Sequence, residues 1–324
     1  RDPEMSRGLG DVYKRQIKNR ERTEKMLHIK NLHKSYGAFE VLRGLEMNVN
    51  TGDIYGFLGK NGCGKTTTMN IVSNIIPKDS GEINFGKENC KIGYLPETPS
   101  MFTYMNGYEY LDYIASCCSY KDDKKKRIDE VINIVGMAEG GKRRIKGYSR
   151  GMNQRLGIAA AIFDHPDLLI LDEPTSALDP QGRAEVMSII KNLADMGTTI
   201  ILCTHILSDV ERTANRIGIV RDGRMAVEGT IAEIKEQYDK AGKKIVMGIF
   251  GDPSAAIQPV STLTGGNFYF DRQRAVFEIP IASDINEQET AHRLFDLLNS
   301  AGLTVSLFVI ENKTLEQIYM ETIG

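Results

Sequence analysis

A glycine-rich segment between an apolar strand and a helical run restricts the fold of this chain more than any other feature. Residues 59–66 read GKNGCGKT and match the pattern G-x-x-x-x-G-K-[ST]. The residues before them, IYGFL, are typical of a buried central strand, and a helical run follows to about Ile76. Glycines let such a loop wrap closely around an anion, and the start of the helix adds aligned N–H groups. The segment therefore predicts a phosphate-binding loop in an α/β sheet.

The polar side chains of this loop suit a nucleoside triphosphate bound with magnesium. Lys65 can neutralise the β- and γ-phosphates, and the Thr66 hydroxyl can bind Mg²⁺. A nucleoside triphosphate and Mg²⁺ are therefore the expected ligands. The residues of the loop predicted to bind the nucleotide are Gly59, Lys60, Asn61, Gly62, Cys63, Gly64, Lys65, Thr66 and Thr67.

An acidic pair follows another apolar strand further along the chain. Residues 168–173 read LLILDE, so two carboxylates stand at the carboxyl end of a strand, where open α/β sheets bind ligands. Asp172 can hold Mg²⁺, usually through water. Glu173 points the other way and can orient and deprotonate an attacking water. Such a pair on its own is as often a helix cap, but together with the phosphate loop it predicts a hydrolytic site.

Short apolar strands alternate with amphipathic helices after Met26, which is typical of a mainly parallel α/β sheet. Residues 97–163 show helical periods without strand signals, and we interpret them as a helical insert. Asp222 and Gly223 predict a hairpin turn. Strands are expected at residues 27–34, 41–49, 54–58, 168–171, 199–203, 217–220 and 225–227, and helices at 181–195, 207–213 and 231–238.

Three segments are expected from this pattern. Residues 1–25 are polar and rich in arginine, and we interpret them as a disordered tail or a cloning or sequence-assembly remnant. Residues 26–240 form the main domain. A break at residues 241–242 then begins a small α+β appendage, residues 241–324. Its strands are expected at residues 245–250, 268–270, 275–279 and 304–310, and its helices at 287–299 and 315–321.

The composition excludes some classes of function. The 41 basic and 43 acidic groups leave a net charge of −2, which argues against a dedicated nucleic-acid binder, so no nucleic-acid partner is expected. No apolar run approaches the roughly 18 to 20 residues of a membrane helix, so any membrane crossing is expected in another chain. The five cysteines have neither zinc-site nor disulfide spacing and suit a reducing cytosol.

Residues 148–155, YSRGMNQR, narrow the class of nucleotide-binding protein. Ser149 and the N–H groups near Gly151 open a helix and can hold the γ-phosphate of an ATP bound to another subunit. An ordinary helix capped by Ser149 is the alternative. The motif resembles the signature of ABC ATPases. It also lies between the phosphate loop and LLILDE, in the order found in that family. The resemblance covers about residues 26–238 and implies an α/β P-loop NTPase fold of the ABC type, with an antiparallel β subdomain and a helical subdomain.

The resemblance implies roles for four further residues. Tyr36 is similar to the aromatic residue that stacks on adenine, and Glu97 occupies the place of the glutamine that approaches the nucleotide and its metal. Asp179, in SALD, resembles the residue of a loop that crosses the dimer interface. His205 resembles the switch histidine that reaches the γ-phosphate, so the implied catalytic residues are Glu173 and His205. The implied metal ligands are Thr66, Glu97 and Asp172.

Three residues depart from the commonest family pattern. Met152 stands in place of glutamine and matters little, because the contacts with the γ-phosphate come from Ser149 and Gly151. Glu97 also replaces glutamine, and its charge would change how metal binding couples to the helical insert. Cys63 replaces a small residue, and alkylation of its thiol is expected to block nucleotide binding.

The resemblance implies the ATP-hydrolysing subunit of an ABC transporter. Two copies, or one copy and a close homologue, are expected to dimerise around two ATP molecules and to drive a separate transmembrane permease. The subunit is expected in the cytoplasm, on the inner face of the cell membrane. Glu97, the YS form of the signature and residues 314–320, TLEQIYM, are similar to bacterial exporters of drugs, peptide antibiotics or polymers.

Three other functions remain open at this stage. ABC ATPases that act on DNA carry long coiled coils between the two nucleotide motifs, whereas residues 65–172 show no sustained heptads. Ribosome-associated factors normally carry two cassettes, whereas this chain has one phosphate loop. A nucleotide sensor without turnover would not need Glu173 and His205, which argue against it.

Overall fold

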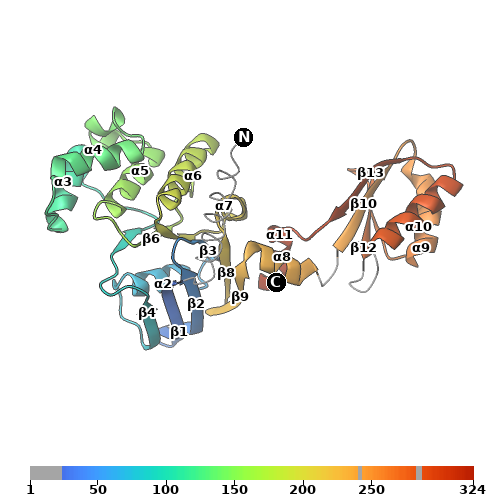
Figure 1. The fold of residues 1–324 in the computed structure, drawn as a ribbon, viewed down its shortest axis with the longest axis horizontal. Helices are drawn as coiled ribbons and strands as arrows, with labels where there is room; N and C mark the ends of the chain where they lie inside the picture. The colour runs from blue at the N-terminus through green and yellow to red at the C-terminus, as the bar shows by residue number, and fades with distance from the viewer. Residues whose placement is uncertain (1–23, 240–242, 282–286) are drawn as a thin grey trace, which may run out of the picture. The chain divides into compact units, whose positions relative to one another are not determined.

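The computed structural model describes residues 24–239, 243–281 and 287–324, and it divides into two compact units (Figure 1). Unit 1 comprises the chain up to Thr230 together with Ile323, and unit 2 comprises Ile231–Thr322 with Gly324. Of the tail expected at residues 1–25, residues 1–23 lie outside the described residues.

A six-stranded sheet forms the centre of unit 1 and places the nucleotide motifs. Its strands, in order across the sheet, are β5 (Ile92–Leu95), β6 (Leu168–Asp172), β7 (Thr199–Cys203), β3 (Ile54–Gly59), β8 (Arg216–Arg221) and β9 (Arg224–Thr230). The first five are parallel, and β9 pairs antiparallel with β8 through the predicted turn at Asp222 and Gly223. β3, β6 and β7 are buried along their whole length, as their continuous apolar sequences predict.

A smaller antiparallel sheet packs against the central one. It comprises β2 (Phe39–Asn50), β1 (Lys25–Tyr36) and β4 (Ser80–Phe85), in that order. Apolar side chains of β1 and β2 share one core with Phe57 of β3 and Met69 of α2 (Lys65–Val72). The first two strands were predicted. β4 and β5 were not, because each is short and shows little apolar alternation.

The predicted helical insert, residues 97–163, contains helices, turns and bends but no strand, and an isolated antiparallel β-bridge joins Asn106 and Arg144. α3 (Gly107–Cys117), α4 (Lys124–Ile134) and α5 (Arg150–Ala161) lie together at one end of unit 1, away from β1, β2 and β4 (Figure 1). Each helix begins at a polar cap: Asn106 accepts from the Glu109 N–H, Asp123 from the Lys126 N–H, and Ser149 from the Met152 N–H. α6 (Pro180–Asp195) and α7 (Leu207–Thr213) complete unit 1.

Unit 2 has the β-α-β-β-α-β order of ferredoxin-like folds. The sheet order is β11 (Tyr269–Asp271), β12 (Val276–Ile281), β10 (Lys243–Ile249), β13 (Val305–Glu311), with every neighbouring pair antiparallel. α9 (Ile257–Thr264) and α10 (Glu287–Ser300) contribute to its core. α9 was not predicted because Pro259 interrupts its sequence. Pro259 lies in the first turn, where its missing N–H removes no helical hydrogen bond.

The boundary between the units falls before α8 (Ile231–Asp239), about ten residues earlier than the boundary expected at residue 240. α8 contacts α11 (Leu315–Ile323): the Tyr238 hydroxyl lies 3.1 Å from Thr322 Oγ1. Lys313 Nζ also lies 5.9 Å from the centre of the Tyr238 ring. These contacts join α8 to unit 2, although the resemblance to ABC ATPases extends through it.

A buried arginine joins two helices of the insert. Arg127 Nε donates to the carbonyl oxygen of Phe163 at 2.8 Å, and a terminal nitrogen donates to that of Ile162 at 2.6 Å. A second terminal nitrogen lies 2.9 Å from a carboxylate oxygen of Glu130. The guanidinium of α4 therefore satisfies the carbonyl groups at the end of α5.

We predict that Arg127→Met lowers the free energy of unfolding by about 2–4 kcal/mol, because it leaves two buried carbonyl groups without a donor. Urea denaturation measures the change. Lys126→Met, at an exposed neighbouring position, is the control and should change stability by less than about 0.5 kcal/mol. Equal stability of the two variants would contradict this role of Arg127.

Candidate nucleotide site

The predicted phosphate loop joins β3 to α2, and its glycines are required by close packing. Gly64 precedes the helix with a φ of 108°, and a Cβ built on it would lie 2.6 Å from Leu42 Cδ2. A Cβ on Gly59 would lie 2.7 Å from the carbonyl oxygen of Val220. Neither position has room for a side chain, so the backbone of the loop can form only with glycine there.

Lys65 folds back onto the loop that precedes it. Its Nζ donates to the carbonyl oxygen of Gly59 at 2.7 Å and to that of Lys60 at 3.3 Å, and the side chain is 7% exposed. The ammonium group is thus fixed at the start of α2, where the helix N-terminus also favours negative charge. The loop is therefore arranged to receive an anion.

A cavity of about 380 Å³ opens beside this loop. It brings together residues that lie far apart in the sequence, including both members of the acidic pair. Its lining residues are Val41, Asn61, Gly62, Gly64, Lys65, Thr66, Thr67, Glu97, Asp172, Glu173 and His205.

Asp172 and Thr66 face each other in this cavity. The Thr66 hydroxyl donates to Asp172 Oδ2 at 2.8 Å, whereas Asp172 Oδ1 is buried without a hydrogen-bond partner. Burial raises the pKa of the Asp172 carboxyl, and the nearby charges of Glu173 and Glu97 raise it further, against the Thr66 hydrogen bond and Lys65. Within the described residues, Asp172 forms no ion pair, although Lys65 is near enough to lower its pKa.

These two side chains fit Mg²⁺. A hydroxyl oxygen and an unpartnered carboxylate oxygen are hard ligands of the kind that Mg²⁺ prefers. Within the described residues, no group of three or more His, Cys, Asp or Glu side chains could hold a metal ion. A cation bound by Thr66 and Asp172 would therefore take most of its ligands from phosphate and water.

Glu173 is held in an uncommon backbone conformation next to His205. Its φ is 49°, in the left-handed region, and its N–H donates to the Cys203 carbonyl oxygen at 2.8 Å. Glu173 Oε1 lies 2.9 Å from His205 Nδ1, and Oε2 accepts from the Thr204 hydroxyl at 3.3 Å. The carboxylate is therefore positioned by two residues at the end of β7. Thr204 was not predicted, although it immediately precedes His205.

A second cavity, of about 370 Å³, lies at the start of α5 and contains the signature residues. Ser149 Oγ accepts the Met152 N–H at 3.2 Å, and Asp179 Oδ1 accepts the Gly182 N–H at 2.7 Å. Both residues are therefore helix caps. The cavity is lined by Ser149, Arg150, Gly151, Arg155, Ala177, Leu178, Asp179, Gln181, Gly182 and Glu185, and shares no residue with the phosphate-loop cavity.

Four predicted nucleotide-binding residues line neither of these cavities: Tyr36, Gly59, Lys60 and Cys63. Tyr36 ends β1 and is 52% exposed, with Lys34 Nζ 5.7 Å from the centre of its ring. The Gly59 carbonyl binds Lys65, as described above. Lys60 and Cys63 line a third cavity on the other side of the loop.

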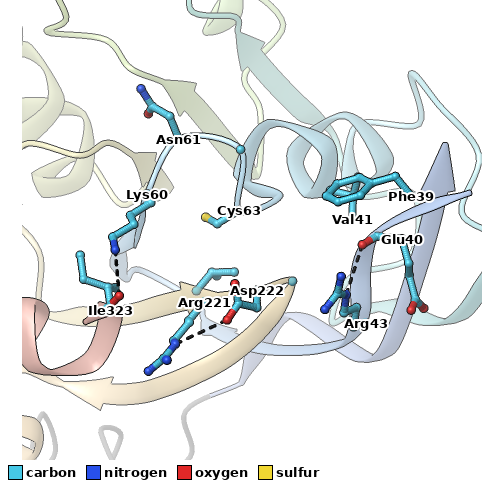
Figure 2. A pocket seen from close by; sticks show the side chains of 13 residues that line it. Phe39, Glu40, Val41, Arg43, Lys60, Asn61, Cys63, Arg221, Asp222 and Ile323 are labelled. Carbon is cyan, nitrogen blue, oxygen red and sulfur yellow. Dashed lines mark hydrogen bonds and ion pairs between the residues drawn. The ribbon is translucent and has the colours of Figure 1, made fainter.

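The third cavity measures about 460 Å³ and lies between the phosphate loop, β2 and the turn between β8 and β9. Figure 2 shows Phe39, Val41 and Arg43 on one side and Lys60, Asn61 and Cys63 on the other. Burial raises the pKa of the Cys63 thiol. Phe39 also lines this cavity and is 62% exposed. It was not predicted as a site residue, and the sequence offered only one indication of it, a large apolar side chain shortly after Tyr36.

A phosphate loop between a buried strand and a helix, with an acidic pair ending a strand of the same sheet, defines an ATP-binding P-loop NTPase. Within this class the chain belongs to the ABC transporter ATP-binding proteins. Residues 42–176 match the family model described as ABC transporter.

Sequence and structural relatives agree with this family. The chain is 33% identical to the uncharacterized ABC transporter ATP-binding protein YxlF of Bacillus subtilis, over 92% of this chain and 99% of the relative. It is also 33% identical to the bacitracin transport ATP-binding protein BcrA of Bacillus licheniformis, over 91% of this chain and 96% of the relative. A solved structure of the ATP binding subunit of an ABC transporter has a TM-score of 0.60 and 26% identity, and the match covers 66% and 93% of the two chains.

ATP-binding proteins of this family hydrolyse ATP for transport, so the chain is an ATPase. Within the part of the chain that the structure describes, no helix is long and apolar enough to cross a membrane.

We predict that Asp172→Asn raises the free energy of unfolding of the nucleotide-free protein by about 1 kcal/mol at neutral pH and abolishes ATP hydrolysis. The raised pKa means that folding penalises the charged carboxylate. The penalty is fully present above the folded-state pKa and disappears as the pH falls below the unfolded value, so the gain should shrink on acidification.

Urea denaturation at neutral and acidic pH measures this difference. Asp195→Asn, at an exposed position that ends α6, is the control and should change stability by less than about 0.5 kcal/mol. An Asp172→Asn protein less stable than the wild type at neutral pH would contradict the prediction.

We predict that iodoacetamide modifies Cys63 more slowly than the exposed Cys117, because burial disfavours the Cys63 thiolate. Once modified, the loop should lose ATP affinity, because Cys63 Sγ packs against Gly59, where an added Cβ would lie 2.5 Å from it, and the added group would extend into the cavity beside the loop. Mass spectrometry gives the extent of modification, and equilibrium titration gives the affinity. A Cys63→Ala protein should keep its affinity after the same treatment; full affinity of stoichiometrically modified wild-type protein would reject the prediction.

Proposed function

We propose that this chain is the ATP-hydrolysing subunit of an exporter, in which two copies close around two ATP molecules and drive a separate membrane permease. Each ATP would lie between the phosphate loop of one copy and the Ser149–Gly151 turn of the other. The proposal rests chiefly on one observation: the phosphate-loop cavity and the signature cavity of one chain share no residue. The second copy is therefore proposed to supply the missing half of each site.

The chemistry of the signature cavity supports this arrangement. Ser149 and Gly151 lie at the N-terminus of α5, where N–H groups and the helix dipole favour an anion. A Cβ built on Gly151 would meet nothing closer than 4.0 Å, so the backbone there is open to a ligand. Nearby, Asp179 caps α6 and is proposed to lie at the dimer interface.

The proposed mechanism assigns the first steps to the phosphate loop. Lys65 and the N–H groups of Asn61 to Thr67 bind and orient the phosphates, and Tyr36 stacks on the adenine. Thr66, Asp172 and Glu97 would hold Mg²⁺, which would supply positive charge against the β- and γ-phosphates.

Glu173 is proposed to take the proton of the attacking water. Its Oε1 is 2.9 Å from His205 and its Oε2 accepts from Thr204, so the carboxylate has a defined direction before substrate binds. His205, half-exposed at the end of β7, can then contact the γ-phosphate. These contacts support turnover rather than nucleotide sensing.

Closing and opening of the dimer would couple hydrolysis to the permease. ATP binding holds the copies together, and its hydrolysis removes the γ-phosphate that Ser149 and Gly151 contact. The groove beside Glu97 and the helical insert is the proposed contact with the permease, which would keep the subunit on the cytoplasmic face of the membrane. The exporter assignment is supported by the relative from B. licheniformis, which is a bacitracin transport ATP-binding protein.

We predict that Glu173→Gln protein is monomeric without nucleotide and forms a stable dimer with ATP, because ATP is bound but not hydrolysed. Light scattering after size-exclusion chromatography measures the mass. The control adds Gly151→Asp, which fits the open space at that position but places a carboxylate where the γ-phosphate would lie. The double variant should bind ATP and remain monomeric.

Two results would count against the proposal. If Glu173→Gln binds ATP and stays monomeric, the second copy does not complete the site. If the double variant dimerises as well as Glu173→Gln, dimerisation does not depend on the signature turn.

A further inference from the structure

The loop that carries the carboxylate of Glu173 is strained at two residues. Glu173 has a φ of 49° and Ala177 a φ of 53°, both in the left-handed region although neither is glycine. Within the loop, the Ser176 N–H donates to the Glu173 carbonyl oxygen at 3.1 Å. Strained residues of this kind persist only where the surrounding structure holds them. Residues 173–179, which we call the carboxylate loop, therefore need contacts with other elements.

A buried carboxylate on α7 supplies such a contact. The Thr175 hydroxyl donates to Asp209 Oδ2 at 2.7 Å, and the two residues are 1% and 5% exposed. Arg183 Nε, which is buried without a hydrogen-bond partner among the described residues, lies 4.0 Å from the same oxygen. Thr175 precedes Ala177, whereas Arg183 lies in the first turn of α6, beyond the end of the loop. Asp209 therefore contacts the chain on both sides of the strained residue Ala177.

The helix that carries Asp209 is fixed against the strand that leads into the phosphate loop. A Cβ built on Gly56, in β3, would lie 2.5 Å from Val210 Cγ1, so α7 packs directly on the β3 backbone. Val210 is fully buried, and the Thr213 hydroxyl donates to the Asp209 carbonyl oxygen at 2.6 Å. Because β3 continues into the phosphate loop, close packing gives Asp209 a fixed position relative to the loop that receives the phosphates.

We propose that Asp209 is a positioning residue for ATP hydrolysis: its hydrogen bond with Thr175 fixes the carboxylate loop and thereby the direction of the Glu173 carboxylate. This role rests on the proposed function, in which Glu173 takes the proton of the attacking water. Asp209 lines neither the phosphate-loop cavity nor the signature cavity, so it acts without touching the nucleotide. A displacement of about 1 Å at a reacting group can cost on the order of a hundredfold in rate, so a bond two residues from Glu173 is expected to affect turnover.

A second buried threonine provides a matched control for a purely structural hydrogen bond. Thr199 is the first residue of β7, is fully buried, and accepts the Gly52 N–H on its hydroxyl oxygen at 2.9 Å. It lies at the opposite end of β7 from His205. Thr175→Val and Thr199→Val each remove one buried hydroxyl with little change in side-chain size, but only the first removes a contact of the carboxylate loop.

The test is steady-state ATP hydrolysis by the full chain over a range of ATP concentrations. Thr175→Val should lower kcat at least about tenfold and change KM by less than about twofold, because the phosphate loop that binds ATP is unaltered. Thr175→Ser keeps the hydroxyl and should retain kcat within about threefold of wild type. Thr199→Val should retain kcat within about twofold. Urea denaturation should show similar losses of stability in the two valine variants.

A double variant shows whether Thr175 and Asp209 act through one bond. Asp209→Ala removes the acceptor of the Thr175 hydroxyl. The combination with Thr175→Val should lower kcat no further than the larger single loss, to within about twofold, because both changes break the same hydrogen bond. If Asp209→Ala does not fold, the comparison of Thr175→Val with Thr175→Ser and Thr199→Val decides the question. Glu173→Gln, measured beside these variants, should lose more activity than any of them.

Three outcomes would overturn the role of Asp209. A wild-type kcat in Thr175→Val would show that turnover does not need the bond. Equal losses of kcat in Thr175→Val and Thr199→Val would reduce the bond to a general contribution to stability. Additive losses in the double variant would show that the two residues act independently. If Glu173→Gln is inactive in any of these cases, only the role of Asp209 fails, whereas a fully active Glu173→Gln protein would reject Glu173 as the base of the proposed function.

Discussion

The buried ammonium group of Lys65 is the interaction on which the nucleotide site depends. It is held by the carbonyl oxygens of Gly59 and Lys60, and the loop that carries it has no room for a side chain at positions 59 and 64. The loop is thus arranged for an anion before one binds, and little ordering remains to oppose binding. Leu42 of the antiparallel sheet packs against the loop at Gly64, so that sheet supports the site as well as the core.

Negative charge in the same cavity balances this cation. Asp172 and Glu173 are adjacent in sequence, but the left-handed backbone at Glu173 directs the two carboxylates to different partners. Asp172 meets Thr66, whereas Glu173 meets His205 and Thr204. In the proposed mechanism one carboxylate takes a metal and the other takes a proton, a separation that strain at a single residue makes possible.

Most of the central sheet could be predicted, since β3, β6 and β7 are continuous apolar runs next to recognisable motifs. β4 and β5 could not, because each is short and carries a weak apolar pattern, and α9 could not, because Pro259 interrupts its sequence. The structure gathers Lys65, Thr66, Asp172, Glu173 and His205 in one cavity, as expected from strands that end at the same edge of a parallel sheet. Side-chain direction in the loop could not be predicted: Lys60 and Cys63 share the motif with Lys65, yet they line another cavity. In a strand, successive side chains point to opposite faces, so their directions can be predicted from the sequence. In the phosphate loop the backbone turns at glycine residues, and this rule no longer applies.

The signature turn shows why a motif can serve the fold and a ligand at once. Ser149 already accepts the Met152 N–H as an ordinary cap, and Asp179 does the same for α6. A hydroxyl cap uses one lone pair and retains a proton that can be donated, so Ser149 can cap α5 and also bind a phosphate oxygen. A carboxylate cap such as Asp179 has no proton to donate at neutral pH. The two caps of this cavity therefore differ in chemistry: of the two, only Ser149 can donate to the phosphate proposed to bind here, while Asp179 can accept only from donors, such as the N–H groups of the proposed second copy.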